Sequence, residues 1–351
     1  MNQFTNIPIF RGIPRWILLF MFLWTVIALL DPVLAGEGCI LPYHFSSINP
    51  SESLLPPFSK GTKGMHILGT DKLGRDVAAA MIHGAKVSFV VAFGTIVLSL
   101  LFGSILGLLS GYFGNNRVKK NILQQTIILL AICIIGYYMY LFVTFGFNSA
   151  DFAVFIGWIL TFLFVEKYSQ NLPLKKRGLP IDFFVQRMFE LRETIPSIFI
   201  VLAAISIIKS PSYITMIFVI SILIWLTFAS HFRAQALVLR EQKFVSVAKA
   251  SGMSHARILG FHIFPNAFMP IIVIVIFATS NVILLESTLS FLGLGLPLEE
   301  MSWGKLLAAS RKSQSAWWLA VFPGLAIFIV LITLNRLGDH LSLRYQDADK
   351  N

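Results

Sequence analysis

Residues 68–76 read LGTDKLGRD and place four charged side chains beside two glycines. The charged side chains could pair with one another or with a docked protein, and the glycines permit tight turns. For each residue taken singly we favour the simpler interpretation, a local salt-bridged cap on the end of the helix that follows. The candidate residues of this motif are Gly69, Asp71, Gly74, Arg75 and Asp76.

One ionisable residue, Glu286, lies in an otherwise apolar run. A charge at membrane depth is costly and usually functional. The carboxyl could line a translocation pathway or pair with a buried partner, and its place near the end of the run could also let it reach water. Glu286 is therefore a possible pathway residue, with these alternatives open.

Catalytic motifs are absent from the sequence. No G-x-x-x-x-G-K-[ST] run is present, so ATP would have to be hydrolysed by another chain. No G-x-S-x-G or H-E-x-x-H run supports an intramembrane hydrolase. His255 and His262 would share a helix face but lack carboxylate or cysteine ligands nearby. We expect no metal site, no cofactor and no catalytic residue.

The composition is that of a membrane protein. Hydrophobic residues make up 56% of the 351 residues and charged residues only 13%, whereas soluble proteins average about 25% charged residues. Several apolar runs reach the roughly 20 residues that a spanning helix needs. The predicted fold class is an all-α, polytopic helical bundle. The net charge of +11 fits basic cytoplasmic loops better than nucleic-acid binding.

Arg and Lys concentrate in the loops on one side of the candidate spans, whereas acidic residues offset the basic ones on the other side. We therefore expect both termini to be cytoplasmic, and Gly36–Lys86 and Leu294–Ala316 to be external. The eight candidate spans are Ile13–Leu34, Ser88–Ser110, Ile122–Phe145, Phe152–Val165, Ile195–Ile208, Tyr213–Phe228, Phe268–Leu285 and Trp317–Leu334. The fifth of them would begin with a polar foot near Phe183.

Small residues recur at every fourth position of the second span, at Ser99, Gly103, Gly107 and Gly111. Such a face lets another helix approach closely. We predict packing at this face, within the bundle or against a partner subunit, and no chemistry.

A polar island, Arg233–Pro265, separates two of the spans. Apolar residues recur at helical spacing in its first half. Gly252 then ends the helix, Ser254 can cap a short second helix, and Pro265 marks entry into the next span. A helix, a glycine turn and a short helix can insert into a groove of a partner protein. The alternative, an amphipathic loop on lipid headgroups, would not need the glycine break.

Several segments resemble one known family, in the same order along the chain. Residues 240–267, REQKFVSVAKASGMSHARILGFHIFPNA, resemble the EAA loop of binding-protein-dependent ATP-binding cassette importer permeases. Residues 66–76, HILGTDKLGRD, and residues 286–295, ESTLSFLGLG, with SWG at 302–304, resemble signatures of the second permease subunit of dipeptide, oligopeptide and nickel importers. GLLSGYFG at 107–114 adds a further match. The resemblance covers about residues 66–114 and 182–345.

The resemblance implies a MetI-like permease core of six spans and a cytoplasmic loop that contacts an ATPase around Gly252. Ser246 stands where the family has glutamate, so we expect shape and apolar contact to carry more of the coupling than charge. Carried over onto this chain, the coupling residues are Arg240, Glu241, Ser246, Ala248, Ala250, Gly252, His262 and Pro265.

The same resemblance divides the chain. Relative to the family, roughly 65 residues with two apolar runs are inserted after GYFG, and their role could be peripheral packing, lipid contact or docking of an accessory protein. Two added helices keep the remaining spans on their expected sides. The expected segments are a cytoplasmic foot with the first span (1–35), an external segment (36–87), the second span (88–114), the inserted region (115–181), the permease core (182–345) with the loop 233–265, and a tail (346–351).

These features predict a permease subunit of an inner-membrane importer for peptides, nickel or related small solutes. It would form half of the pathway with a related permease. Two ATPase subunits, an extracytoplasmic binding protein and membrane lipids would be its partners, and nucleic acid would not. The alternatives are an ion-coupled secondary transporter, which would need ionisable residues at mid-membrane and repeated halves, and a non-transporting scaffold.

Overall fold

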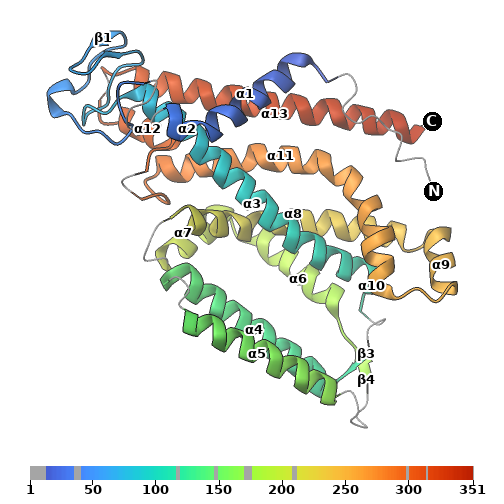
Figure 1. Ribbon diagram of the computed structural model, residues 1–351. Coiled ribbons are helices and arrows are strands. Elements are labelled where there is room, and N and C mark those ends of the chain that lie inside the picture. The colour runs from blue at the N-terminus through green and yellow to red at the C-terminus, as the bar shows by residue number, and fades with distance from the viewer. Residues whose placement is uncertain are drawn as a thin grey trace. The chain divides into compact units, whose positions relative to one another are not determined.

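The computed structural model describes residues 13–34, 41–115, 119–145, 149–169, 176–207, 212–297, 300–313 and 315–350. The predicted foot before residue 13 and the predicted boundary between residues 35 and 36 lie outside these ranges. The described chain is helical apart from two small antiparallel sheets, as the predicted all-α class requires (Figure 1). It divides into two compact units: unit 1, with Met1–Leu98, Pro211–Ile224 and Pro270–Asn351, and unit 2, with Ser99–Ser210 and Trp225–Met269.

Unit 1 holds the first elements of the chain and the last helices. A core around Val77, Leu306 and Leu319 joins the start of α3 to α12 and α13, and Ile17 of α1 packs with Leu341 of α13. The elements are α1 (Arg15–Leu29), α2 (Asp31–Leu34), a 3₁₀ turn (Pro50–Glu52), β1 (Ser59–Lys60), β2 (Met65–His66), α12 (Trp303–Ser310), α13 (Trp318–Lys350), and parts of α3 (Val77–Phe113), α8 (Tyr213–Leu239) and α11 (Phe264–Phe291).

Unit 2 holds the remaining parts of α3, α8 and α11 and the elements between them. β3 and β4 pair antiparallel, with Lys120 opposite Arg177. The further elements are β3 (Lys119–Asn121), α4 (Ile122–Phe145), α5 (Ser149–Ser169), β4 (Lys176–Gly178), α6 (Ile181–Thr194), α7 (Ser197–Ile207), α9 (Lys243–Ala250), α10 (His255–Arg257) and a π-helical turn (Ile258–Ile263).

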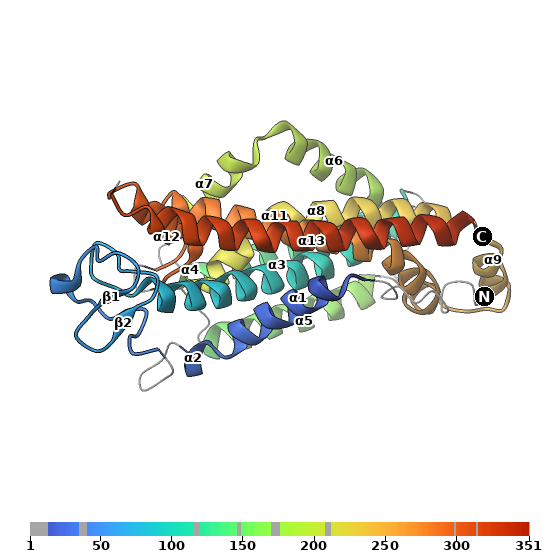
Figure 2. The ribbon, with the colours of Figure 1, turned by 90° about the horizontal axis from the view of Figure 1, so that it is seen from above.

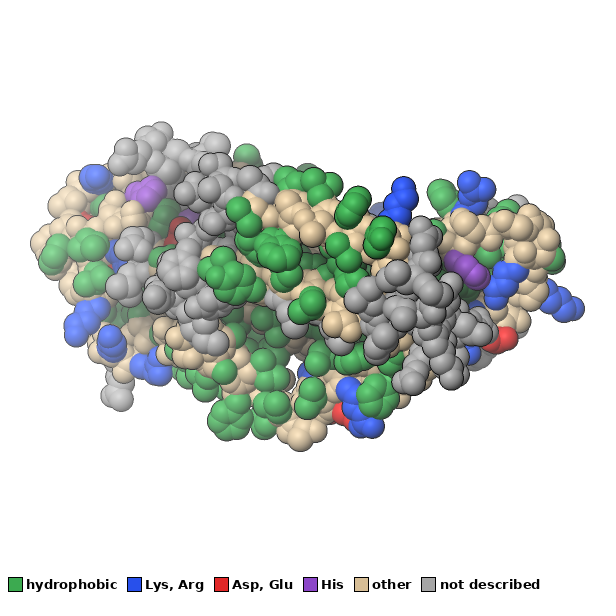
Figure 3. Space-filling model, turned by 90° about the horizontal axis from the view of Figure 1, so that it is seen from below, with side chains coloured by type: hydrophobic (Ala, Val, Ile, Leu, Met, Phe, Trp, Pro, Cys, Tyr) green, Lys and Arg blue, Asp and Glu red, His purple; other side chains and the backbone are tan. Residues whose placement is uncertain are grey.

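Four helical stretches among the described residues are long and apolar enough to cross a membrane, and two further apolar helices are shorter. Exposed hydrophobic side chains are abundant on the described surface (Figure 3), as hydrocarbon-facing helices require. The protein is therefore an α-helical, multi-pass membrane protein. The four long stretches are Val77–Phe113, Tyr213–Leu239, His255–Phe291 and Trp318–Asp347.

Several helix ends differ from the predicted spans. α3 begins at Val77 rather than Ser88, because the carboxylate of Asp76 accepts a hydrogen bond from the Ala79 N–H (2.8 Å) and caps the helix. The predicted fifth span, Ile195–Ile208, is α7, and its expected polar foot is a separate helix, α6, since Pro196 between them has no N–H to continue the first. The loop predicted at 294–316 contains α12.

The small face of α3 packs closely against α8 in unit 2, which confirms the predicted close approach. A Cβ on Gly111 would lie 2.5 Å from the carbonyl oxygen of Arg233 and 2.8 Å from the Cβ of Ala236. Gly103 and Gly107 face the same helix just as closely. Only glycine lets the two backbones approach this far.

Candidate coupling site

The polar loop, residues 240–263, follows α8 and leads into α11. α8 continues through Arg233 to Leu239, so the first residues of the predicted island belong to the long helix instead of the loop. α9 comes next, then a turn at Gly252, then α10, whose N-terminus is capped by the Ser254 hydroxyl accepting from the Arg257 N–H (3.4 Å). The predicted helix, glycine turn and short helix are all present, and α9 lies beyond the end of α8 (Figure 2).

Gly252 is required by its backbone angle. Its φ of +76° lies in the left-handed region, which costs other residues roughly 1–2 kcal/mol. A Cβ placed there would meet no atom within 4 Å. The backbone conformation of this turn, and not a lack of room for a side chain, therefore requires glycine.

The polar loop presents an apolar surface. α9 turns Val245 and Ala248 inward, where both are buried, and leaves Ser246 and Ala250 exposed. Val247 is 64% exposed and Phe261 is 77% exposed. Exposed apolar side chains of this size on a polar segment are typical of a surface that another protein covers.

Two further residues of the predicted coupling set lie at the end of the polar loop. The ring of His262 is tilted over Phe244 with 6.4 Å between ring centroids, and its carbonyl oxygen accepts a hydrogen bond from the Asn266 side chain (2.6 Å). Pro265 lies exposed in the first turn of α11. Among the described residues, neither the His262 nor the Pro265 side chain makes a hydrogen bond or ring contact with the turn at Gly252.

The last turn of α3 holds the polar loop. The Arg240 guanidinium donates to the carbonyl oxygen of Gly111 (2.8 Å) and, through Nε, to Glu241 (2.9 Å). The buried hydroxyl of Tyr112 lies 2.8 Å from Nδ1 of His255. The Lys249 ammonium lies 5.4 Å above the Tyr112 ring, close enough for a cation–π contact.

An ion pair joins α6 and α8 beside the same turn of α3. Arg233 binds the Asp182 carboxylate with two nitrogens, at 2.5 Å and 3.0 Å. The Ser110 hydroxyl donates to that carboxylate at 2.6 Å. The hydrogen bond from Arg233 holds the pKa of Asp182 below its usual value of 3.8, and outweighs the opposite effect of burial.

We call these contacts the α3 clamp: Ser110, Gly111 and Tyr112 with Asp182, Arg233, Arg240 and His255. From the sequence only Arg240 was a site candidate. The other partners lie far apart in the chain, and the short run SGYFG at 110–114 is the only local signal that marks the α3 side.

The 68–76 motif forms a local structure in unit 1. Gly69 and Gly74 have φ of +81° and +72°, where glycine is favoured. Asp71 accepts hydrogen bonds from the N–H groups of Leu73 (2.8 Å) and Arg75 (2.9 Å), and pairs with the Arg75 guanidinium at 2.8 Å. This is the geometry of the local salt-bridged cap.

His66 completes that structure and was not a candidate. Its ring is fully buried between two carboxylates, with Nδ1 2.7 Å from Asp76 and Nε2 3.2 Å from Glu52. Tyr43 stacks on the ring with centroids 4.1 Å apart. We call residues 41–76 the cap segment. No motif marks Tyr43 or Glu52 in the sequence.

A second histidine in unit 1 also bridges two carboxylates. His83 lies 3.1 Å from Asp31 through Nδ1 and 2.7 Å from Glu300 through Nε2. Lys86 pairs with Asp31 at 2.9 Å. The sequence did not predict this group either, because its residues lie far apart in the chain. Among the described residues no three His, Cys, Asp or Glu side chains could hold a metal ion.

Glu286 is fully buried near the end of α11. Its carboxylate accepts hydrogen bonds from the hydroxyls of Ser290 (2.8 Å), Ser88 (3.2 Å) and Ser287 (3.3 Å). Ser88 belongs to α3, so the carboxylate links two membrane helices of unit 1. Hydroxyl donors can satisfy a buried carboxyl group without a cation.

Known proteins similar to this chain are permeases. A dipeptide transport system permease of Alkalihalophilus pseudofirmus is 29% identical over 317 residues, 90% of this chain and 79% of the relative. A di/tripeptide transport system permease of Pseudomonas aeruginosa is 28% identical over 326 residues, 92% and 84%. A dipeptide transport system permease of Haemophilus influenzae is 27% identical, covering 92% and 86%.

The family model for the inner membrane component of binding-protein-dependent transport systems matches residues 168–347. This range is more than half of the chain, and it includes the polar loop, Asp182 of the α3 clamp and Glu286. Helices long enough to span a membrane lie within the same range. The chain belongs to the family of inner-membrane components of binding-protein-dependent transport systems.

Proposed function

We propose that this chain is a peptide permease subunit of an ATP-binding cassette importer, and that the polar loop couples it to an ATPase. The relatives named above transport dipeptides or tripeptides, which favours peptides over nickel as the substrate class. The chain would form half of the pathway beside a related permease. ATP would be hydrolysed in separate subunits, and a binding protein would deliver the peptide.

The exposed apolar surface of the polar loop is the observation that carries this proposal. Val247 and Phe261 are mostly exposed and lie on either side of the Gly252 turn. A groove in the ATPase would cover them, as grooves cover the apolar face of a helix. Ser246 offers no carboxylate for an ion pair, so the contact would rest on shape and apolar burial.

The α3 clamp gives the polar loop a mechanical connection to the membrane helices. Arg240 and His255 of the loop bind consecutive residues at the end of α3, and Asp182 joins α6 to the same turn. A force on the loop would therefore act on several helices together. In the proposed cycle, ATP-driven closure of the ATPases displaces the loop and the helices it holds, and hydrolysis resets them.

The proposed orientation places the polar loop and both termini in the cytoplasm, because basic residues concentrate on that side. The cap segment would then face the binding protein. Its charged residues largely bind one another, so we propose a structural role for Gly69, Asp71, Gly74, Arg75 and Asp76 and not direct recognition. The pathway role of Glu286 stays a prediction, and its serine contacts suit a link between α3 and α11.

The test is peptide uptake by cells that carry Gly252→Pro in the complete importer. Proline cannot adopt φ of +76°, so the turn would be lost while the membrane helices remain. We expect uptake to fall to background with normal amounts of the protein in the membrane. Gly260→Ala is the matched control, since Gly260 lies in the same loop with open space around its Cβ position. Normal uptake by Gly252→Pro would refute the coupling role.

Co-purification tests the apolar contact separately. Phe261→Asp should reduce the amount of ATPase recovered with a tagged chain in mild detergent, because it puts a charge into the proposed interface. Met65→Asp, at an exposed position of the cap segment, should leave recovery unchanged. If the unaltered chain recovers no ATPase, the proposed function fails.

A further inference from the structure

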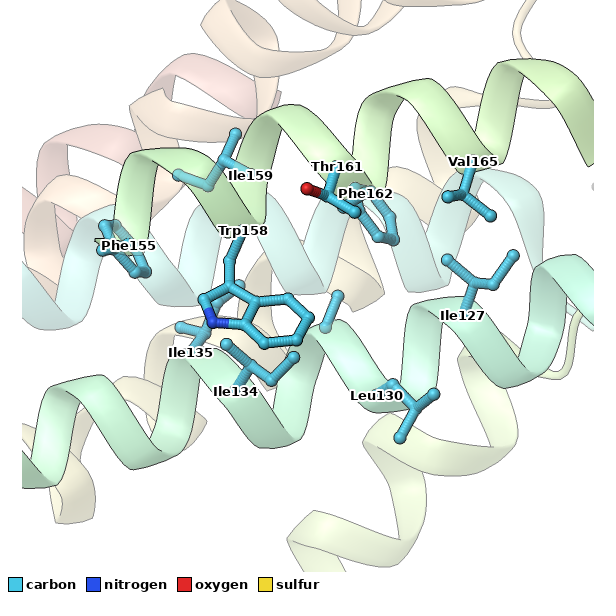
Figure 4. A pocket seen from close by; sticks show the side chains of 11 residues that line it. Ile127, Leu130, Ile134, Ile135, Phe155, Trp158, Ile159, Thr161, Phe162 and Val165 are labelled. Atoms are coloured by element: carbon cyan, nitrogen blue, oxygen red, sulfur yellow. The ribbon is translucent and has the colours of Figure 1, made fainter. Parts of the chain in front are cut away.

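The hairpin formed by α4 and α5 contains a groove that peptide import does not explain. The two helices lie side by side, and the β3–β4 pair closes one end of the hairpin (Figure 1). A groove of about 650 Å³ runs between them (Figure 4). The family match begins at residue 168, so nearly all of this hairpin precedes it.

Apolar side chains line the groove. Thr161 is the one hydroxyl residue among the lining side chains, and its hydroxyl donates to the Gly157 carbonyl oxygen of its own helix (2.8 Å). In Figure 4 the indole of Trp158 reaches from α5 toward Ile134 and Ile135 of α4. A groove with such a surface takes an apolar ligand.

The side chains of the groove favour a flexible chain over a protein helix. Membrane helices pack closely where Gly, Ala, Ser or Thr let their backbones approach. Here the lining is dominated by bulky residues such as Ile127, Leu130, Phe155 and Phe162, and Ala131 is the smallest of them. An acyl chain can pass between these side chains, whereas a rigid helix would be held away by them.

The groove has the length of one membrane leaflet. From Phe155 to Val165 it extends about 15 Å along α5, at a rise of 1.5 Å per residue. That is half of the roughly 30 Å hydrocarbon core of a bilayer. Ile127 and Val165 mark one end of the groove, within about two turns of the start of α4, which directly follows β3, and of the end of α5.

The end of the hairpin next to the groove is basic. We call β3 and β4 the basic ribbon, because Lys119, Lys120, Lys176 and Arg177 are four of its residues and no acidic residue belongs to either strand. Lys120 is opposite Arg177 in the register. A bound anion would offset the positive charge that the residues of these two strands carry.

We propose that the hairpin binds an anionic phospholipid, with an acyl chain in the α4–α5 groove and the phosphate at the basic ribbon. Under the proposed orientation the lipid comes from the cytoplasmic leaflet, whose anionic headgroups attract basic segments next to the membrane. The proposed lipid site needs only the groove and the basic ribbon, so the proposal does not depend on which substrate the protein transports.

The experiment uses the complete chain in phosphatidylcholine nanodiscs, with phosphatidylglycerol or phosphatidylcholine that carries bromine on its acyl chains. Bromine quenches a nearby indole, and the quenching that Trp158→Phe removes reports on the groove. We expect brominated phosphatidylglycerol to quench Trp158 at lower mole fraction than brominated phosphatidylcholine. Lys120→Gln with Arg177→Gln should weaken this preference on the order of tenfold. The control, Lys60→Gln with Lys63→Gln, changes the same charge at exposed positions of the cap segment.

A second variant tests the groove without touching the ribbon. Ala131→Phe fills the groove, so quenching of Trp158 by both lipids should fall. Equal quenching by the two lipids, or an unchanged preference in the ribbon variant, would overturn the headgroup site. If neither lipid quenches Trp158, lipid does not occupy the groove and the proposal is wrong. The proposal is also wrong if a protein covers this face of the hairpin.

Discussion

The two ends of α3 are held by different chemistry. At its start, in unit 1, the cap segment places His66 between two carboxylates and pairs Asp71 with Arg75. At its other end, in unit 2, the α3 clamp uses one ion pair, a backbone carbonyl and a tyrosine hydroxyl. The first end is built from residues of one short segment, whereas the second is built from residues that lie far apart in the sequence.

This difference fits the tasks proposed for the two ends. The bonds inside the cap segment fix where the helix begins, because the Asp76 carboxylate that contacts His66 also caps α3. The α3 clamp instead ties together α3, α6, α8 and the polar loop. The polar loop is joined to α8 and α11 by the chain itself, and contacts of this kind add α3 and α6 to the helices that a movement of the loop would reach.

The largest effect is expected at the start of α3. His66→Leu should destabilise unit 1 by about 4 kcal/mol, because it leaves two buried carboxylates facing each other without the ring that bridges them. Thermal unfolding in detergent measures the change. His44→Leu, at a half-buried histidine of the same segment whose ring bonds only the neighbouring Ser46 hydroxyl among the hydrogen bonds of its side chain to other side chains, is the control and should have little effect. A small effect at His66 would remove the contrast between the two ends.

At the other end, Arg233→Ala should cost about 3 kcal/mol, because it removes both hydrogen bonds to the partly buried Asp182. The exposed pair of Arg187 with Glu190 in α6 provides the control, and Arg187→Ala should cost less than about 1 kcal/mol. The same unfolding assay compares them. Equal costs would mean that the Asp182 pair is no more than a surface contact.

Close packing should show a smaller effect. Gly111→Ala should cost about 2 kcal/mol, because the new methyl group would overlap the Arg233 carbonyl oxygen. It should also weaken the Arg240 contact, and thus lower peptide uptake more than it lowers stability. Gly136→Ala in α4, with nothing near its Cβ position, should stabilise the helix by roughly 0.5–1 kcal/mol. A neutral Gly111→Ala would show that α3 and α8 can separate freely.

The smallest effect is one of pH. Because the pKa of Asp182 is lowered in the folded protein, its carboxylate stabilises the fold fully at pH values above its usual value of 3.8. That contribution is lost as pH falls through the lower, folded-state pKa. The Tm difference between the unaltered chain and Asp182→Asn should therefore stay constant above about pH 5 and shrink in stronger acid. A difference that grows on acidification would contradict the assigned direction.

Much of the fold could be predicted because its signals are local. The bounds of α4 match the predicted span Ile122–Phe145, since an uninterrupted apolar run ends where polar residues begin. The turn at Gly252 follows from a glycine after a helical stripe. The predicted fifth span, Ile195–Ile208, corresponds to α7, whereas the polar foot expected at its start is a separate helix, α6, because Pro196 interrupts the hydrogen bonding. The predicted span ended at Phe228 because polar and basic residues follow it, whereas α8 continues to Leu239, and Arg233 in this extension binds Asp182.

The sequence by itself determined the membrane class, the family, the polar loop with its glycine turn and the small face of α3. Each depends on residue types at fixed short spacing, which the backbone converts directly into a helix face or a turn. Only the tertiary structure decided which residues meet at the α3 clamp, that hydroxyl groups surround Glu286, and that His66 and His83 each bridge two carboxylates. Those contacts join residues as far as 217 positions apart, and short-range spacing carries no information about such distances.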